Sequence, residues 1–130
     1  MGHAGSSSLT IAARHIFDGA DMRGPGSVRI SQGRIESITF SKAAVRASIQ
    51  LPADAILAPG FIDVQVNGGG GVLLNDQPTE AGVRRFIEAH RKAGTTGCLP
   101  TLITDRIEVV ERLAAVAEAC LTIPGVLGFH

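Results

Sequence analysis

The sequence has no excess of charge of either sign. Twelve Lys and Arg residues balance twelve Asp and Glu residues, and neither sign is strongly concentrated in any stretch. Proteins that bind nucleic acids or anionic membranes carry clustered positive charge. We therefore expect neither nucleic acid nor a membrane as a partner.

Long apolar runs and paired cysteine motifs are also missing. The longest apolar runs are far shorter than a membrane span, and the opening MGHAGSSS has no apolar segment of the kind that a signal peptide needs. Cys98 and Cys120 lie far apart within apolar patterns, which is typical of buried free thiols in a reducing compartment. We expect a cytoplasmic protein whose residues 1–8 are a tag or a disordered tail.

Motifs for catalysis are absent as well. The sequence has no H-x-H, no H-E-x-x-H and no cysteine cluster, so it predicts no orthodox zinc site within these residues. It also lacks G-x-S-x-G or another nucleophile motif with a candidate base nearby.

The first part of the sequence, residues 9–57, has the short alternating patterns of β-strands. LTIAARHIFDG ends in an Asp-Gly turn, and SVRISQGRIESITF predicts a hairpin around Gln32-Gly33. A weaker pattern predicts a further strand that ends at Pro52. These strands are too few to close a sandwich alone. The apolar residues expected to share buried surface in the hairpin are Val28, Ile30, Ile35, Ile38 and Phe40.

Residues 58–130 change to an alternation of strands and helices. The order is the strand FIDVQVNG, a helix from Thr79 to Ala93, the strand GCLPTLI, a helix from Asp105 to Leu121, and the strand VLGFH. This βαβαβ order is typical of a parallel sheet. Two helices leave much of such a sheet uncovered. We therefore expect an α/β protein of which these residues are the N-terminal piece, most consistent with the start of a barrel.

Each predicted helix has start and stop signals. Thr79 is the expected N-cap of the first helix, which should end at Gly94. Asp105 and Glu108 have capping-box spacing for the second helix, which should end before Pro124-Gly125. The residues expected to be buried are Val83, Phe86, Ile87 and His90 in the first helix and Val109, Val110, Leu113, Ala117 and Cys120 in the second.

Polar or glycine-rich residues follow the carboxyl ends of all three predicted barrel strands, where α/β proteins bind ligands. Strand alternation places Asp63, Gln65 and Asn67 on one face. They either serve a site, or Asp63 holds the strand by hydrogen bonds while the other two border solvent. NGGGG is either a phosphate-binding loop or a structural loop, and His130 is either a ligand or a structural residue.

The order of G-x-I-x-x-I, LAPGFIDVQVNGGGG, AGTTGCLPTLIT and GVLGFH resembles the amidohydrolase superfamily. Within it, Gln65-x-Asn67 stands where many members have H-x-H, and this feature resembles the N-acetylglucosamine-6-phosphate deacetylases. The resemblance covers Leu9 to His130. It implies that residues 9–57 are part of a small β-sandwich and that residues 58–130 begin a TIM-like (β/α)8 barrel.

The resemblance also implies a function for the complete enzyme. It implies hydrolysis of the acetamide of an amino-sugar phosphate, N-acetylglucosamine 6-phosphate, to glucosamine 6-phosphate and acetate by a homodimer. One divalent ion, zinc, would assist the reaction, because amide side chains at 65 and 67 are poor zinc ligands for a second site. The metal ligands and the catalytic aspartate would lie outside residues 1–130, so we expect no bound metal and no activity in these residues alone. The residues implied to line the active site are Gln65, Asn67, Gly68, Gly69 and His130.

Two other interpretations remain open. One is another amidohydrolase, such as a deaminase or a cyclic amidase, although histidines at 65 and 67 would favour it and are missing. The other is a noncatalytic binding or assembly module that keeps the glycine loop without a metal centre. Metal content separates the deacetylase from this module.

Overall fold

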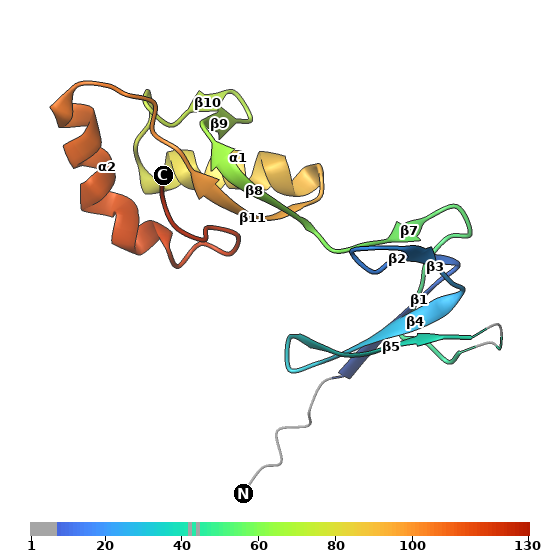
Figure 1. Cartoon of the computed structure of the whole chain (residues 1–130). Helices are drawn as coiled ribbons and strands as arrows, with labels where there is room; N and C mark the ends of the chain where they lie inside the picture. Colours follow the sequence, from blue (N-terminus) through green and yellow to red (C-terminus); the bar gives the residue numbers. More distant parts are fainter. Residues whose placement is uncertain (1–7, 42, 44) are drawn as a thin grey trace, which may run out of the picture. The chain divides into compact units, whose positions relative to one another are not determined.

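The computed structural model describes residues 8–41, 43 and 45–130 (Figure 1). The chain divides into two compact units, Met1–Pro59 and Gly60–His130, and each is described separately. The predicted tail lies outside the described residues except for Ser8, which begins the first strand. No described helix has both the length and the apolar character needed to cross a membrane.

The first unit is built from β-strands in two sheets. One sheet has the order β5-β4-β1-β6 and the other has the order β3-β2-β7. The strands are β1 (Ser8–Ala13), β2 (His15–Phe17), β3 (Met22–Arg23), β4 (Gly26–Ser31), β5 (Arg34–Phe40), β6 (Ile49–Gln50) and β7 (Ile56–Leu57).

The predicted hairpin is confirmed as the antiparallel pair β4–β5. Gln32 and Gly33 form its turn with φ angles of 51° and 72°, the left-handed conformation that tight two-residue hairpin turns require. Val28 is buried, but the expected burial of Ile35 and Ile38 is wrong, since they are 65% and 39% exposed. The reason is that β5 is an edge strand with a neighbour on one side only, β4.

A tight turn joins two strands of the smaller sheet. The predicted Asp-Gly turn is confirmed, because Asp18 Oδ1 accepts hydrogen bonds from the backbone N–H groups of Ala20 and Asp21, and Gly19 has a φ of 105°. This turn joins β2 to β3 and brings them into antiparallel pairing. The core of the first unit is small. Its buried cluster contains Ala13, Ile16 and Val28, with Ile30, Phe40, Leu51 and Leu57 packed against it.

The second unit follows the predicted order of strands and helices as far as α2, with an additional short hairpin between the first strand and the first helix. Strands β8 and β11 are parallel and are joined through α1, and residues 126–130 run beside β11. The predicted strand VLGFH is wrong, because these residues form no regular strand and are assigned a single bridge, between Cys98 and Val126. The described residues form an open sheet and no closed barrel. The elements are β8 (Phe61–Val66), β9 (Gly68–Gly69), β10 (Val72–Leu73), α1 (Glu80–Lys92), β11 (Thr95–Pro100) and α2 (Ile107–Cys120).

Helix α1 has the predicted signals at both ends. Thr79 is its N-cap, and Thr79 Oγ1 accepts a hydrogen bond of 3.1 Å from the backbone N–H of Gly82. Gly94, with a φ of 95°, follows the C-cap residue. The face expected to be buried is confirmed at Val83, Phe86 and Ile87, whereas His90 is half-buried.

Helix α2 differs from the prediction at its start. The expected capping box is wrong, because the N-cap is Arg106 and makes no side-chain capping bond. The carboxylate of Asp105 instead accepts hydrogen bonds from the backbone N–H of Arg106 and from the side chain of Asn75. Val110 is 41% exposed, contrary to expectation, while Val109 and Cys120 are buried as predicted. Leu113 is also buried, and Ala117 is half-buried.

The core of the second unit lies between the sheet and the helices. The first part of β8 is poorly covered by other elements. Its residues Phe61, Ile62 and Val64 are 68%, 66% and 64% exposed. This agrees with the expectation that two helices leave apolar surface of a parallel sheet bare. The buried cluster is Val66, Leu74, Val83, Phe86, Ile87, Cys98, Leu113, Cys120, Ile123 and Val126.

Candidate functional site

Hydrogen bonds join the carboxyl ends of the three parallel segments in the second unit. The Asn67 side-chain amide donates a hydrogen bond of 3.2 Å to the carbonyl of Thr101, and the Thr101 N–H donates one of 2.7 Å to the carbonyl of Val66. The Leu102 N–H donates one of 2.9 Å to the carbonyl of His130. The structure therefore ties Asn67, Thr101 and His130 to one edge, where ligands bind in parallel α/β sheets.

Gln65 and Asp63 have different environments from Asn67. Asp63 Oδ1 accepts a hydrogen bond of 3.0 Å from the backbone N–H of Gln65, so Asp63 holds its own strand, as one interpretation of the sequence expected. The side chain of Gln65 is exposed. Burial raises the pKa of the neighbouring Cys98 thiol, and the negative charge of Asp63 raises it further. A catalytic thiolate at Cys98 is therefore disfavoured.

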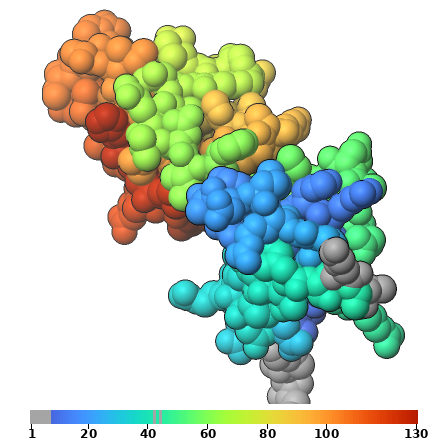
Figure 2. All heavy atoms as spheres, turned by 45° about the vertical axis from the view of Figure 1, so that its right-hand side comes forward, coloured from blue at the N-terminus to red at the C-terminus, as the bar shows by residue number. Residues whose placement is uncertain are grey.

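The glycine loop forms a small hairpin, β9–β10, that packs against α1. In Figure 2 the yellow-green segment that contains it lies beside the gold helix. Gly70 and Gly71 make the turn with φ angles of 60° and 77°. His90 Nε2 lies 2.9 Å from the carbonyl oxygen of Gly68, and a Cβ on Gly69 would lie 2.7 Å from the same nitrogen. These contacts support the structural interpretation of the loop. The role of Gly68 and Gly69 as active-site residues stays a prediction. The same holds for Gln65, Asn67 and His130.

The sequence interpretation missed Asn75, whose side chain is 9% exposed. Asn75 Nδ2 donates hydrogen bonds of 2.8 Å to the carbonyl of Ile103 and to Asp105 Oδ2, and Asn75 Oδ1 accepts one of 3.1 Å from the Ile103 N–H. The bond from Asn75 is the main cause that lowers the pKa of Asp105. The one local signal for Asn75 is its place directly after the apolar run Val72–Leu74.

The described residues do not fit a metal ion. No group of three or more His, Cys, Asp or Glu side chains among them could hold one. The position of the H-x-H motif carries two amides, and the amide nitrogen of Asn67 is turned toward the carbonyl of Thr101. Amides are weak ligands for zinc compared with imidazole.

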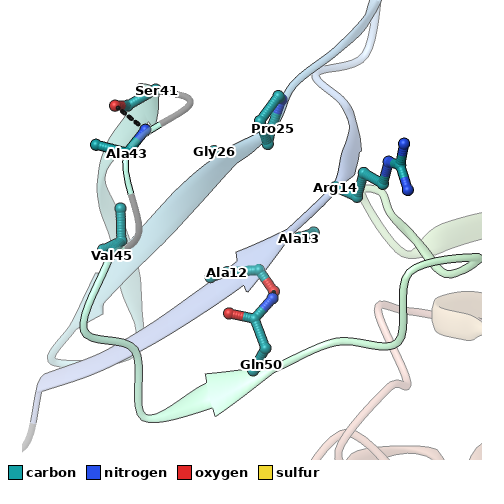
Figure 3. A pocket seen from close by; sticks show the side chains of 9 residues that line it. All are labelled: Ala12, Ala13, Arg14, Pro25, Gly26, Ser41, Ala43, Val45 and Gln50. Carbon is teal, nitrogen blue, oxygen red and sulfur yellow. Dashed lines mark hydrogen bonds between the residues drawn. The ribbon is translucent and has the colours of Figure 1, made fainter.

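A pocket of about 190 Å³ lies in the first unit (Figure 3). Gln50 Nε2 donates a hydrogen bond of 3.4 Å to the carbonyl of Ala12, and Ser41 Oγ accepts one of 3.1 Å from the N–H of Ala43. None of the predicted active-site residues lines this pocket. Its lining residues are Ala12, Ala13, Arg14, Pro25, Gly26, Ser41, Ala43, Val45 and Gln50.

Comparison with solved structures identifies the class of protein to which the fold is similar, the sugar-phosphate deacetylases. An N-acetyl-D-glucosamine-6-phosphate deacetylase from Mycobacterium smegmatis matches 87% of this chain with a TM-score of 0.76 and 25% identity. The chain covers 29% of that protein. The enzyme of the same name from Thermotoga maritima matches 94% of this chain with a TM-score of 0.74 and 21% identity, a likeness of fold alone.

Sequence comparison names particular relatives. The N-acetylgalactosamine-6-phosphate deacetylase of Shewanella sp. (strain ANA-3) is 41% identical over 127 residues, which are 88% of this chain. The N-acetylglucosamine-6-phosphate deacetylase of Bos taurus is 37% identical over 109 residues, which are 75% of this chain. The chain spans 32% and 26% of the length of these two relatives. No family model matches the chain.

Over most of its length the chain is therefore similar to part of the N-acetylglucosamine- and N-acetylgalactosamine-6-phosphate deacetylases. The resemblance noted from the sequence is confirmed, and so is the mixed α/β fold class, which matches the N-terminal part of these enzymes.

Proposed function

We propose that the complete polypeptide containing residues 1–130 hydrolyses the acetamide of N-acetylglucosamine 6-phosphate to glucosamine 6-phosphate and acetate. The observation that carries this proposal is the agreement of sequence and fold. Relatives with this named activity are similar over 75% of the chain, and a solved enzyme of the same name matches 87% of it. Asn67 and His130, two of the residues predicted to line the active site, are tied to the edge of the sheet where such proteins bind ligands.

A second candidate substrate is N-acetylgalactosamine 6-phosphate. It is favoured by one observation, the 41% identity to a relative named for that substrate over 88% of this chain. The two sugars differ only in the configuration of the hydroxyl group at C4. A site built to hydrogen-bond one configuration leaves polar groups unpaired with the other, so enzymes can separate such substrates strongly.

The proposal extends to the rest of the protein. A TIM-like barrel would be completed by residues outside 1–130, which would also supply the ligands for one divalent ion, zinc, and the catalytic aspartate. A divalent ion held by those ligands would supply Lewis-acid chemistry for hydrolysis of the amide. The enzyme would be a cytoplasmic homodimer. Residues 1–130 alone would hold no metal and would show no activity.

The test is an assay of the complete protein together with its intact mass. The relatives predict a mass of about three times the 13.5 kDa of this chain. Acetate release is measured with both sugar phosphates, with and without a chelator, and metal content is measured on the same sample. Residues 1–130 expressed alone are the matched control.

Each outcome of this assay decides between the interpretations. Chelator-sensitive release from N-acetylglucosamine 6-phosphate, with a clear excess over the other sugar, supports the main proposal. A preference for N-acetylgalactosamine 6-phosphate moves the assignment to the second candidate. No release from either sugar by a metal-loaded protein refutes both and leaves another amidohydrolase. A protein without metal or activity supports a binding or assembly module.

A further inference from the structure

One buried side chain joins the two loops that follow β8 and β11. Asn75 lies between β10 and α1, and all three of its side-chain hydrogen bonds go to Ile103 and Asp105, in the segment between β11 and α2. These partners are 28 and 30 residues away in the sequence. The contact is therefore made by the tertiary fold and is not a local turn.

The carboxylate of Asp105 orients the Asn75 amide. Ionised carboxylate oxygens accept hydrogen bonds and donate none, so the NH2 group of Asn75 must face Asp105. The amide oxygen is then turned toward the N–H of Ile103, and the NH2 group also reaches the carbonyl of Ile103. One side chain thus satisfies both backbone groups of Ile103, as a neighbouring strand would do.

The segment held in this way also contacts the predicted active-site residues. Its first residues, Thr101 and Leu102, are hydrogen-bonded to the Asn67 side chain and to the His130 carbonyl. Asn75 and Asp105 hold its other end. We infer that Asn75, oriented by Asp105, is a positioning residue that fixes residues 101–105 against Asn67 and His130 at the active-site edge. This inference rests on the proposed deacetylase function.

The test compares single and exchanged variants in the complete protein. Asn75→Asp removes the NH2 group that donates to Asp105 and to the Ile103 carbonyl, and it places two carboxylates against each other, which repels the loop. The double variant Asn75→Asp with Asp105→Asn restores a donor facing an acceptor and keeps the acceptor for Ile103. Asp105→Asn alone keeps an acceptor for Asn75. Asp76→Asn makes the same chemical change as the Asp105 variant at the exposed neighbouring residue and is the matched control.

We expect Asn75→Asp to lower kcat for the preferred sugar phosphate by about 100-fold, with a smaller change in KM, since misplacing active-site groups by about 1 Å can cost that much. The exchanged double variant should regain about tenfold of this loss, and Asp76→Asn should match the wild type. Equal kcat per folded molecule in Asn75→Asp, or a double variant no better than the single, would overturn the positioning role.

A second measurement does not depend on substrate. Hydrogen exchange of the Ile103 amide should be slow in the wild type, because this amide bonds to Asn75. It should be about 100-fold faster in Asn75→Asp, because the repulsion between residues 75 and 105 moves the loop away from this acceptor, and slower again in the double variant, where the repulsion is removed. Unchanged exchange in Asn75→Asp would overturn the inference even if kcat falls. If the wild type releases no acetate, the proposed function fails and the positioning role with it. The exchange data then still decide whether Asn75 holds the loop.

Discussion

Replacing Phe86 by Ala should destabilise the second unit more than any exposed change on the same helix. Phe86 is 0% exposed and lies in the core cluster between α1 and the sheet. Its ring also meets the ring of His90 edge to face, with 6.4 Å between the centroids. Deleting a buried Phe side chain costs about 3–5 kcal/mol, because apolar contacts are lost and a cavity remains. A change to Leu should cost less than the change to Ala, because Leu keeps more of the apolar volume.

The assay is hydrogen exchange of the α1 amides in the complete protein, which measures the free energy of local opening. At about 1.4 kcal/mol per factor of ten, Phe86→Ala should speed exchange by roughly 140-fold to 4,000-fold. Glu88→Ala, an exposed change on the same helix, should stay within about 0.5 kcal/mol of the wild type. An acceleration below about tenfold for Phe86→Ala would refute the assignment of this residue to the core of the unit.

Three further predictions concern the helix cap, pH and the thiols. Thr79→Ala should lower the free energy of opening of α1 by about 1 kcal/mol, because the N–H of Gly82 loses its acceptor. Thr79→Ser keeps a hydroxyl group and should restore most of this free energy. Equal hydrogen-exchange rates in the two variants would contradict the prediction. The bond from Asn75 lowers the pKa of Asp105 in the folded state, so its contribution to stability is present above the ordinary value of 3.8 and is lost as pH falls through the lower folded pKa. The stability difference between wild type and Asp105→Asn should therefore shrink below about pH 4, and a difference constant down to pH 2 would contradict it. Cys98 and Cys120 should react slowly with a thiol reagent at pH 8 until the protein unfolds, because burial covers both thiols and raises their pKa values. Rapid labelling of the folded protein, measured by mass spectrometry, would disprove this.

Signals that act over a few residues were sufficient to predict most elements. Thr79 and Gly94 delimit α1 because a cap side chain and a left-handed glycine act on the nearest turn. Gln32-Gly33 gives the β4–β5 turn for the same local reason. The resemblance to the deacetylases likewise depended on the order of short motifs, and the comparisons confirm it.

The wrong predictions concern side chains whose environment is set by residues far away in the sequence. Asp105 has capping-box spacing with Glu108, yet its carboxylate is bound by Asn75, which is 30 residues away. Val110 lies on the expected apolar face of α2 but stays exposed, because periodicity predicts a face and not how much of that face a neighbour covers.

The sequence by itself therefore determined the main order of strands and helices, both ends of α1 and the similarity to sugar-phosphate deacetylases. It also placed Asn67 directly after the end of β8, because strand alternation and turn chemistry are properties of neighbouring residues. Only the tertiary structure decided that the glycine hairpin packs on α1 and that Asn75 holds the segment after β11. The physical reason is that a buried polar group must find its partners in three dimensions, and those partners have no fixed spacing in the sequence.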